Sequence, residues 1–525
     1  MKTKITARPR QESNAEGNAA AAQNTENRRR CKVLMIQGTM SNAGKSVIAA
    51  GLCRIFHQDG YKTAPFKSQN MALNSCVTEE GLEMGRAQVM QAECAGIAPR
   101  VCMNPILLKP TDDRGSQVIV NGKAIGNMRA AEYFRKKKSF LPDILAAFEE
   151  LAKENDIIVV EGAGSPVEMN LKKDDIVNMG LAELLDAQVF LVGDIDRGGI
   201  FAQILGTLDL LTDEERARVR GVIVNKFRGD ASLFEDGIRI LEERGRTKVT
   251  GVVPWLEVHL DDEDSLSGRF QRRAAADADI AVIRLPHISN FTDPDTFEQL
   301  TEISIRYVSS PEELGSPGMI ILPGSKNTIG DLRWMKENGL ADRIREEAKA
   351  GRIIFGICGG YQMLGRSVSD PEHAECGGSE EGLGLLPVDT VLAGSKVTTV
   401  FKGKITGATG ALRELAGKEA GGYEIHMGVT TVDEGTTEFT SGGTGCCRDD
   451  VYGTYVHGIF DRKEILEVVV QKLFAAKGKQ VRTDGLTDYA AYKETQYDLL
   501  ADHLRRNLNM KEIYESLGIG KDDAG

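Results

Sequence analysis

Short apolar runs alternate along the first half of the chain with longer segments of helical length. The runs occupy residues 33–38, 157–162, 188–194, 221–226 and 249–255, and most of them end at a glycine or a polar residue. Continuous Val- and Ile-rich runs that are separated in this way are typical of a parallel sheet covered on both faces. The pattern therefore predicts a doubly wound α/β domain.

A polar and acidic stretch at 259–279 interrupts this rhythm, and a second series of apolar runs follows at 280–286, 318–325, 351–360 and 451–460. Such a change in composition is typical of a domain boundary. The first thirty residues are polar and rich in Ala and Asn, as in disordered segments. We therefore predict two doubly wound α/β domains, divided as follows: a disordered tail at 1–30, a first domain at 31–262, a linker at 263–279, a second domain at 280–475 and a C-terminal helical tail at 476–525.

The C-terminal tail carries apolar residues at near-helical spacing, namely Tyr497, Leu500, Leu504, Leu508 and Tyr514. This periodicity predicts an amphipathic helix with one buried face. A helix at the end of the chain can cover its own domain or form a subunit contact. We expect it to cap the second domain.

Composition narrows the classes of function. A net charge of −12 argues against a general nucleic-acid-binding protein, and the sequence contains no apolar run near the 18 residues of a membrane span. The nine cysteines include no Cys-x-x-Cys pair, so neither a disulfide framework nor a zinc site is indicated. We expect a cytoplasmic protein with no nucleic-acid or membrane partner; its oligomeric state is not predicted.

The segment "GTMSNAGKS" lies between the first apolar run and a helix-like stretch. A glycine-lined turn in this position directs backbone N–H groups and a helix N-terminus at phosphate oxygens, while a lysine adds positive charge and a serine hydroxyl binds Mg²⁺. The spacing Gly-x5-Gly-Lys-Ser is one residue longer than the common phosphate loop, as in the dethiobiotin-synthetase-like group. The predicted nucleotide-binding residues of this turn are Gly38, Thr39, Asn42, Ala43, Gly44, Lys45 and Ser46.

Two further segments refine the predicted ligand. Glu161 ends a strand in "VVEGAGS", where its carboxylate would hold Mg²⁺ together with Ser46. The segment "VNKFRGD" is similar to a guanine-binding motif, but Arg228 stands where that motif has its base-reading carboxylate. We therefore predict ATP with Mg²⁺, and Asn225 as a candidate contact to adenine.

The stretch "GICGGYQMLG" places Cys358 among glycines directly after an apolar run. Such a sharp strand-to-helix turn exposes a nucleophile, and the helix N-terminus favours a thiolate. His457, at the end of a later strand, is the candidate general base. The backbones of Gly324, in "LPGSKNT", and Gly359 are predicted to form an oxyanion hole.

The two motifs perform complementary halves of one reaction. ATP can activate a carboxylate as an acyl phosphate, and a Cys-His site can release neutral ammonia from glutamine. Shielding both from water would protect the acyl phosphate and the ammonia. The combination predicts an enzyme that makes an amide.

Nine segments, in order, carry a family resemblance: "GTMSNAGKS", "PFKSQNMALNS", "NPILLKP", "VVEGAGSPVE", "GDIDRGGIFA", "LPGSKNT", "GICGGYQMLG", "GYEIHMG" and "YGTYVHGIF". Over residues 32–520 the chain resembles the cobyric acid synthases, the glutamine-dependent amidotransferases of cobalamin biosynthesis. The resemblance implies a dethiobiotin-synthetase-like P-loop domain followed by a class I glutamine amidotransferase domain. It also implies a corrinoid substrate, adenosylcobyrinic acid a,c-diamide, which is amidated at its b, d, e and g carboxylates.

The same resemblance assigns roles to residues in this sequence. Lys45, Ser46 and Glu161 match the nucleotide and Mg²⁺ motif, and Cys358 and His457 match the glutaminase nucleophile and base. The segments at 65–75 and 104–110 are expected to be substrate-side loops. Their candidate substrate contacts are Lys67, Gln69, Asn70, Asn74 and Lys109.

One position departs from the wider amidotransferase class. That class has a glutamate two residues after the histidine, and this chain has Ile459 there. Asp461 or Glu424 could replace it, or Cys358 and His457 could act as a dyad. A missing orienting group weakens a base, so we expect slow glutamine hydrolysis without a bound acceptor.

Three other functions remain open at this point. A cobyrinic acid a,c-diamide synthase shares both domains, and an amidotransferase acting on another polyacid would show the same two motifs. A partition-type ATPase with a decayed second domain would be a binding protein. Intact Cys358 and His457 oppose that last interpretation.

Overall fold

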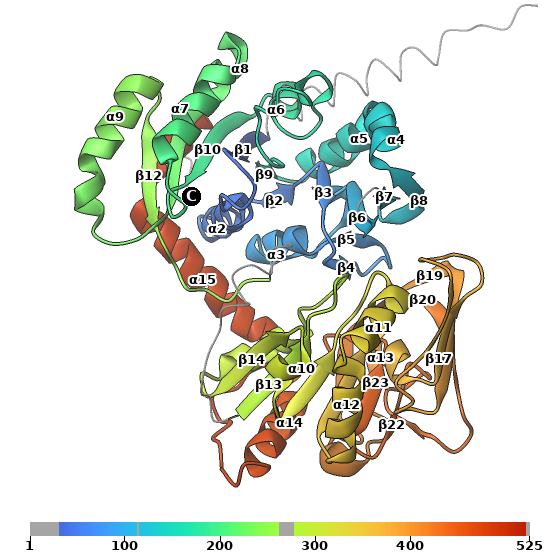
Figure 1. Ribbon diagram of the computed structural model, residues 1–525. Coiled ribbons are helices and arrows are strands. Elements are labelled where there is room, and N and C mark those ends of the chain that lie inside the picture. Colours follow the sequence, from blue (N-terminus) through green and yellow to red (C-terminus); the bar gives the residue numbers. More distant parts are fainter. Residues whose placement is uncertain (1–30, 113–114, 262–277, 521–525) are drawn as a thin grey trace, which may run out of the picture.

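The computed structural model describes residues 31–112, 115–261 and 278–520 (Figure 1). The predicted disordered tail lies outside these ranges, and so does the predicted linker except for its last two residues. Those two residues already belong to the first strand of the second domain, β13 (Ala278–Ile283).

A six-stranded parallel sheet forms the centre of the first domain. All five predicted strands are present in it, and a sixth, shorter strand joins one edge. In spatial order the strands are β12 (Val249–Pro254), β11 (Val219–Phe227), β10 (Gln188–Asp194), β1 (Lys32–Gly38), β9 (Ile157–Glu161) and β2 (Thr63–Phe66).

Alternate residues of these strands enter two different cores. In β1, Val33 and Met35 join one apolar cluster, whereas Leu34 and Ile36 join the other. This is the arrangement that a strand buried on both faces requires. The helices of the domain are α2 (Lys45–Gln58), α3 (Arg86–Cys94), α4 (Ala130–Lys136), α5 (Leu141–Ala152), α6 (Met179–Leu185), α7 (Ile200–Leu210), α8 (Asp213–Arg218) and α9 (Glu235–Gly245).

Two small sheets extend the first domain toward the second. The predicted loops at 65–75 and 104–110 contribute the short strand β3, the first residue of β4 and most of β6 to these sheets. One sheet has the order β3 (Gln69–Met71), β6 (Ile106–Asp112), β7 (Gly115–Val120) and β8 (Lys123–Arg129), and the other pairs β4 (Ser75–Val77) with β5 (Glu83–Gly85).

A seven-stranded mixed sheet forms the centre of the second domain, and each predicted apolar run contributes to it. Its order is β14 (Ile303–Val308), β13, β15 (Met319–Leu322), β16 (Ile353–Ile357), β23 (Val451–Thr454), β22 (Gly445–Arg448) and β21 (Thr437–Glu438). Its helices are α10 (Pro311–Leu314), α11 (Thr328–Glu337), α12 (Leu340–Lys349), α13 (Gly359–Leu364) and α14 (Lys463–Ala475).

A second sheet of this domain reaches the boundary with the first domain. Its order is β18 (Gly378–Glu381), β17 (Ser367–Asp370), β19 (Val388–Lys404), β20 (Glu419–Val432) and β24 (Val456–His457). At the boundary, Tyr423 on β20 donates its hydroxyl hydrogen to the Ser75 carbonyl at 3.2 Å, and Thr398 on β19 donates to the Gly81 carbonyl at 2.9 Å. The two domains therefore meet through β4, its following turn and these long strands.

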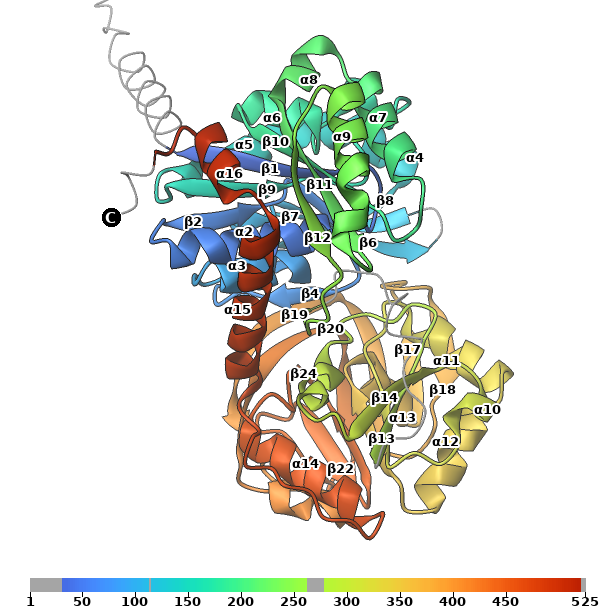
Figure 2. The ribbon, with the colours of Figure 1, turned by 90° about the vertical axis from the view of Figure 1, so that its left-hand side faces the viewer.

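The C-terminal tail packs on the first domain, so the prediction that it caps the second domain was wrong. Helix α15 (Tyr489–Asn507) leaves the second domain and lies along α2, and α16 (Met510–Ser516) follows it (Figure 2). Leu500 and Leu504 contact the face of α2 at Gly51, where a glycine leaves room for them. The apolar spacing identified the buried face but carried no information about its partner.

Truncating a side chain on this buried face of α15 should destabilise the first domain. Leu504 is fully buried, so Leu504→Ala should cost about 2–5 kcal/mol through lost burial and a cavity, and lower the melting temperature by several degrees. Leu499→Ala is the control, because Leu499 lies on the same helix and is 53% exposed. Equal melting temperatures for the two variants would contradict the packing described here.

Candidate functional site

The glycine-rich turn between β1 and α2 has the shape of a phosphate-binding loop. Gly44 has a φ of 99°, in the left-handed region that favours glycine, and a side chain there would collide with the Asn225 amide. That amide donates a hydrogen bond to the Ala43 carbonyl at 2.9 Å. Asn225 therefore braces the loop, and its contact with adenine stays a prediction.

The predicted nucleotide residues divide into two groups. Asn42, Gly44, Lys45 and Ser46 line a large cavity, whereas Gly38, Thr39, Ala43 and Asn225 stand outside its lining. The ammonium of Lys45 donates to the carbonyls of Met40 and Gly164, each at 3.2 Å. These contacts hold the lysine across the loop, where it can reach a phosphate.

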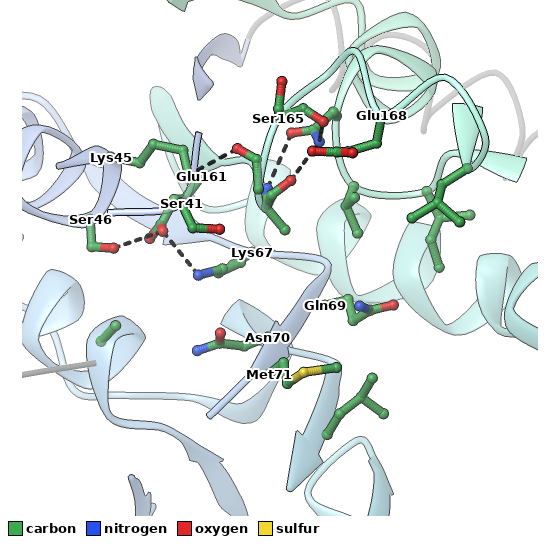
Figure 3. A pocket seen from close by; sticks show the side chains of 18 of the residues that line it. Ser41, Lys45, Ser46, Lys67, Gln69, Asn70, Met71, Glu161, Ser165 and Glu168 are labelled. Carbon is green, nitrogen blue, oxygen red and sulfur yellow. Dashed lines mark hydrogen bonds and ion pairs between the residues drawn. The ribbon is translucent and has the colours of Figure 1, made fainter. Parts of the chain in front are cut away.

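The buried carboxylate of Glu161 organises the polar end of this cavity (Figure 3). It accepts hydrogen bonds from the Ser46 hydroxyl at 2.8 Å, from the Lys67 ammonium at 2.9 Å and from the Gln91 amide at 2.7 Å. The serine and glutamate oxygens fit Mg²⁺, which takes one or two protein oxygens and completes its coordination with phosphate and water. The structure places Ser46 beside Glu161, and their binding of Mg²⁺ stays a prediction.

The cavity itself has a volume of about 720 Å³ and extends well beyond the space next to the loop. Lys67, Gln69 and Asn70 line it as expected, with the Gln69 amide oxygen accepting from the Tyr133 hydroxyl at 2.6 Å. Apolar side chains stand at its rim: Met71 is 53% exposed and Phe134 is 43% exposed. Such an exposed apolar rim around a polar floor suits a large ligand with apolar faces.

The other two predicted substrate residues stand outside the lining of this cavity. Asn74 is buried at the domain boundary, where its amide oxygen accepts from the Phe291 N–H at 3.3 Å. Lys109 forms a buried ion pair with Glu83 at 3.0 Å. It lines a different, smaller cavity, which also contains Cys358.

Cys358 occupies a strained turn between β16 and α13. Its φ of 53° and ψ of −111° are unusual for a residue with a side chain. Glycines make the turn possible, because side chains at Gly356 or Gly360 would collide with neighbouring backbone. The sulfur atom lies 3.4 Å from the Ile425 carbonyl oxygen. This is the nucleophile elbow that the glycine pattern predicted.

The carboxylate that contacts His457 is Asp293, so neither Asp461 nor Glu424 takes this place. Asp293 lies 2.9 Å from Nδ1 of His457 and accepts the Gly458 N–H at 2.6 Å. It begins a short 3₁₀ helix, η6 (Asp293–Gln299), in the segment that follows β13. The expectation of a weakened base assumed that an orienting group is missing, and that assumption was wrong.

The two rejected carboxylates have other surroundings. Burial raises the pKa of Asp461 to about 7, although Lys493 opposes this shift. Glu424 lies 3.6 Å from His426, the histidine that follows it by two residues in β20. Neither is bonded to His457.

The environment of His457 favours its protonated form. Although burial opposes the charge, the Asp293 carboxylate and the neighbouring Cys358 raise the pKa of His457 to about 10. Its Nε2 atom has no hydrogen-bond partner in the part of the chain that the structure describes. One ring nitrogen is thus fixed by Asp293, and the other is available to exchange a proton with a reacting group.

The predicted oxyanion-hole residues share the cavity of Cys358. Gly324, Ser325 and Gly359 all line it. A side chain at Gly359 would lie 2.8 Å from the Ser325 nitrogen, so the two backbones are in close contact. The turns after β15 and β16 therefore lie against each other in the cavity that contains Cys358, and the oxyanion hole stays a prediction.

Comparisons with known proteins agree with both halves of this arrangement. Residues 34–265 match the family of CobQ/CobB/MinD/ParA nucleotide-binding domains, and residues 279–465 match the CobB/CobQ-like glutamine amidotransferase domain. No helix within the described ranges is long and apolar enough to cross a membrane.

Full-length relatives give the same result. The chain is 53% identical to the cobyric acid synthase of Ruminiclostridium cellulolyticum, over 93% of this chain and 98% of the relative. It is 52% identical to that of Lachnoclostridium phytofermentans, over 93% and 99% of the two chains. The chain therefore belongs to the cobyric acid synthase family of glutamine-dependent amidotransferases.

Proposed function

We propose that this chain uses ATP and glutamine to convert adenosylcobyrinic acid a,c-diamide into adenosylcobyric acid by amidating its b, d, e and g carboxylates. The observation that carries the proposal is a large, apolar-rimmed cavity directly beside a phosphate loop, in the same chain as a Cys-His-Asp site. The macrocycle of a corrinoid has extended apolar faces and peripheral carboxylates, which suit such a rim and floor.

The first domain activates the carboxylate. ATP with Mg²⁺ supplies the phosphoryl group that turns it into an acyl phosphate. Lys45 and the N-terminus of α2 bind the nucleotide phosphates, and Ser46 and Glu161 hold the metal. Lys67, which is ion-paired with Glu161 at 2.9 Å, stands between this site and the rest of the cavity and orients the substrate carboxylate.

The second domain releases ammonia from glutamine. The proton of the Cys358 thiol passes to His457, the sulfur attacks the γ-carbonyl carbon, and the Gly359 and Ser325 N–H groups stabilise the oxyanion. His457 gives a proton to the departing nitrogen, so the C–N bond breaks to yield ammonia and a thioester. His457 then takes a proton from water, which hydrolyses the thioester to glutamate and restores the thiol. Asp293 keeps the imidazole in one orientation throughout.

Mass spectrometry of the corrinoid tests the proposed substrate. Incubation with the protein, ATP, Mg²⁺ and glutamine should give four successive replacements of a carboxyl hydroxyl by an amino group, each of which converts a carboxyl group into an amide. Glutamine hydrolysis without any change in the corrinoid would overturn the substrate but leave a two-site amidotransferase. In a second incubation, the fully acidic precursor replaces the a,c-diamide. Amidation of this precursor at its a and c positions would favour the diamide synthase instead.

The role of Lys45 gives a separate prediction. Lys45→Met removes a charge that faces the transferred phosphoryl group, so amidation should fall by about a hundredfold or more with glutamine and with ammonia alike. Lys62→Met, on an exposed lysine of the same domain, is the control. Normal synthesis from ammonia by Lys45→Met would contradict the assignment of the loop.

A further inference from the structure

The cavity that contains Cys358 is lined by four charged side chains, and two of them form ion pairs with the protein. Lys109 and Lys396 both form ion pairs with Glu83. Lys326 and Glu375 form no ion pair with any side chain in the ranges that the structure describes. Within the described ranges, the Lys326 cation and the Glu375 anion therefore line the cavity of the nucleophile without an ion-pair partner.

Hydrogen bonds within the loop that follows β17 hold Glu375 in the cavity wall. The buried carboxylate of Asp370 accepts the N–H groups of Ala374, Glu375 and Gly377 at 2.7–2.9 Å. The Glu375 carboxylate in turn accepts the Thr328 N–H at 2.6 Å. Its position is therefore fixed before any ligand arrives, which lowers the entropy cost of binding.

Lys326 comes from the turn that also supplies the oxyanion-hole backbone. Its N–H donates to the His287 carbonyl at 2.9 Å, and its ammonium donates to the neutral amide oxygen of Gln117 at 3.2 Å. Gln117 lies on β7 of the first domain. These two contacts hold Lys326 next to Ser325, and neither of them is an ion pair with a carboxylate.

Burial makes both charges costly. It lowers the pKa of Lys326 to about 8, with Lys396 and Lys109 adding to the shift. It raises the pKa of Glu375 to about 7, against the opposing effect of Thr328 and Lys326. A ligand that carries one positive and one negative group would relieve both costs.

We propose that Glu375 binds the α-ammonium group of glutamine and Lys326 binds its α-carboxylate, which places the γ-amide at Cys358. This inference rests on the proposed glutaminase role of Cys358 and specifies how that site selects its substrate. Recognition of both α-groups restricts the site to the free amino acid, because amides without them and glutamine within a peptide lack one or both charges. The two residues are specificity determinants, since they touch the substrate away from the reacting bond.

Glu375 also contacts the first turn of α11, so a purely structural role must be distinguished from binding. The test compares two reagents that alkylate Cys358: 6-diazo-5-oxo-L-norleucine, which carries both α-groups of glutamine, and iodoacetamide, which carries neither. Alkylation is followed by mass spectrometry of the peptide that contains Cys358. The rate constant of alkylation by 6-diazo-5-oxo-L-norleucine, divided by that for iodoacetamide, measures recognition of the α-groups. Damage to the fold would instead change the rate of alkylation by both reagents.

Glu375→Gln and Lys326→Met should each lower this ratio by about tenfold or more, as expected for a lost hydrogen bond to a charged group. The controls Glu381→Gln and Lys349→Met, on exposed residues of the same domain, should keep the wild-type ratio. A wild-type ratio in Glu375→Gln and Lys326→Met, including one that results from equal losses of rate with both reagents, would overturn the inference.

The corrinoid assignment and this inference fail in different ways. If the alkylation ratio falls in the two variants but the wild-type protein gives no corrinoid product, the proposed acceptor is wrong and the glutamine contacts are supported. Absence of selective labelling of Cys358 in the wild-type chain would overturn the inference and the glutaminase site together. In synthesis assays, the two variants should raise the KM for glutamine and leave synthesis from ammonia unchanged.

Discussion

Cys358→Ala should abolish amidation from glutamine and preserve amidation from ammonia. The substitution removes the sulfur that forms the proposed thioester, and Cys358 is the only cysteine among the described residues that line this cavity. We expect at least about a thousandfold loss of the glutamine-dependent rate, in line with removal of a nucleophile elsewhere. The proposed acyl phosphate site lies in the other domain, and under the proposed mechanism it needs only dissolved ammonia.

The comparison of nitrogen sources makes this test specific. Cys376→Ala is the matched control, because Cys376 is an exposed thiol in the same domain and should leave both rates near wild type. Loss of synthesis from ammonia as well as from glutamine in Cys358→Ala would show that the substitution damages more than the glutaminase site. Retention of synthesis from glutamine would remove Cys358 from the mechanism.

Asp293→Asn should cause the second largest loss, up to about ten-thousandfold in the glutamine-dependent kcat. The amide keeps the shape of the side chain but can no longer stabilise a protonated His457. Because the carboxylate raises the pKa of His457, this pKa should fall in the variant. The acidic form of the histidine would then be lost at a lower pH, which an NMR titration of the imidazole measures.

Asp461→Asn is the natural control for this prediction. Asp461 is half-buried near the same histidine but is not bonded to it, so the variant should retain most of the glutaminase activity. Equal losses in the two variants would contradict the assignment of Asp293. Synthesis from ammonia should be unchanged by either substitution.

The sequence predicted the strands and the elbow because both depend on local patterns. Strands such as β9 and β10 are continuous apolar runs with helical segments between them, so their boundaries follow from burial on both faces. The turn at Cys358 follows from glycines on each side, since Gly356 and Gly360 are required where helix and strand come closest. No information from distant parts of the chain was needed.

Asp293 was missed because nothing local marks it. It precedes its partner His457 by 164 positions, and an aspartate before a proline is a common helix start. The expected glutamate beside the histidine is instead the buried, apolar Ile459. Only the fold, which brings the segment after β13 against the end of β24, shows where the carboxylate comes from.

The remaining differences from expectation concern the surfaces and side chains that each segment packs against. The tail helix α15 has the predicted apolar face, but the identity of the surface that covers such a face is not written in its own periodicity. Asn74 and Lys109 were grouped with Lys67 because the family resemblance marked the segments 65–75 and 104–110 as substrate-side loops. In the structure Lys109 extends from β6 toward Glu83 and the second domain, whereas the neighbouring Leu108 lines the large cavity.

The central claim is that one chain takes nitrogen from glutamine in its second domain and uses it in its first. The most direct measurement supplies glutamine labelled with ¹⁵N at the amide, together with unlabelled ammonium, and follows the corrinoid by mass spectrometry. We predict product amides that carry ¹⁵N from glutamine in the wild-type protein and unlabelled amides in Cys358→Ala. Unlabelled product from the wild-type protein would contradict the claim.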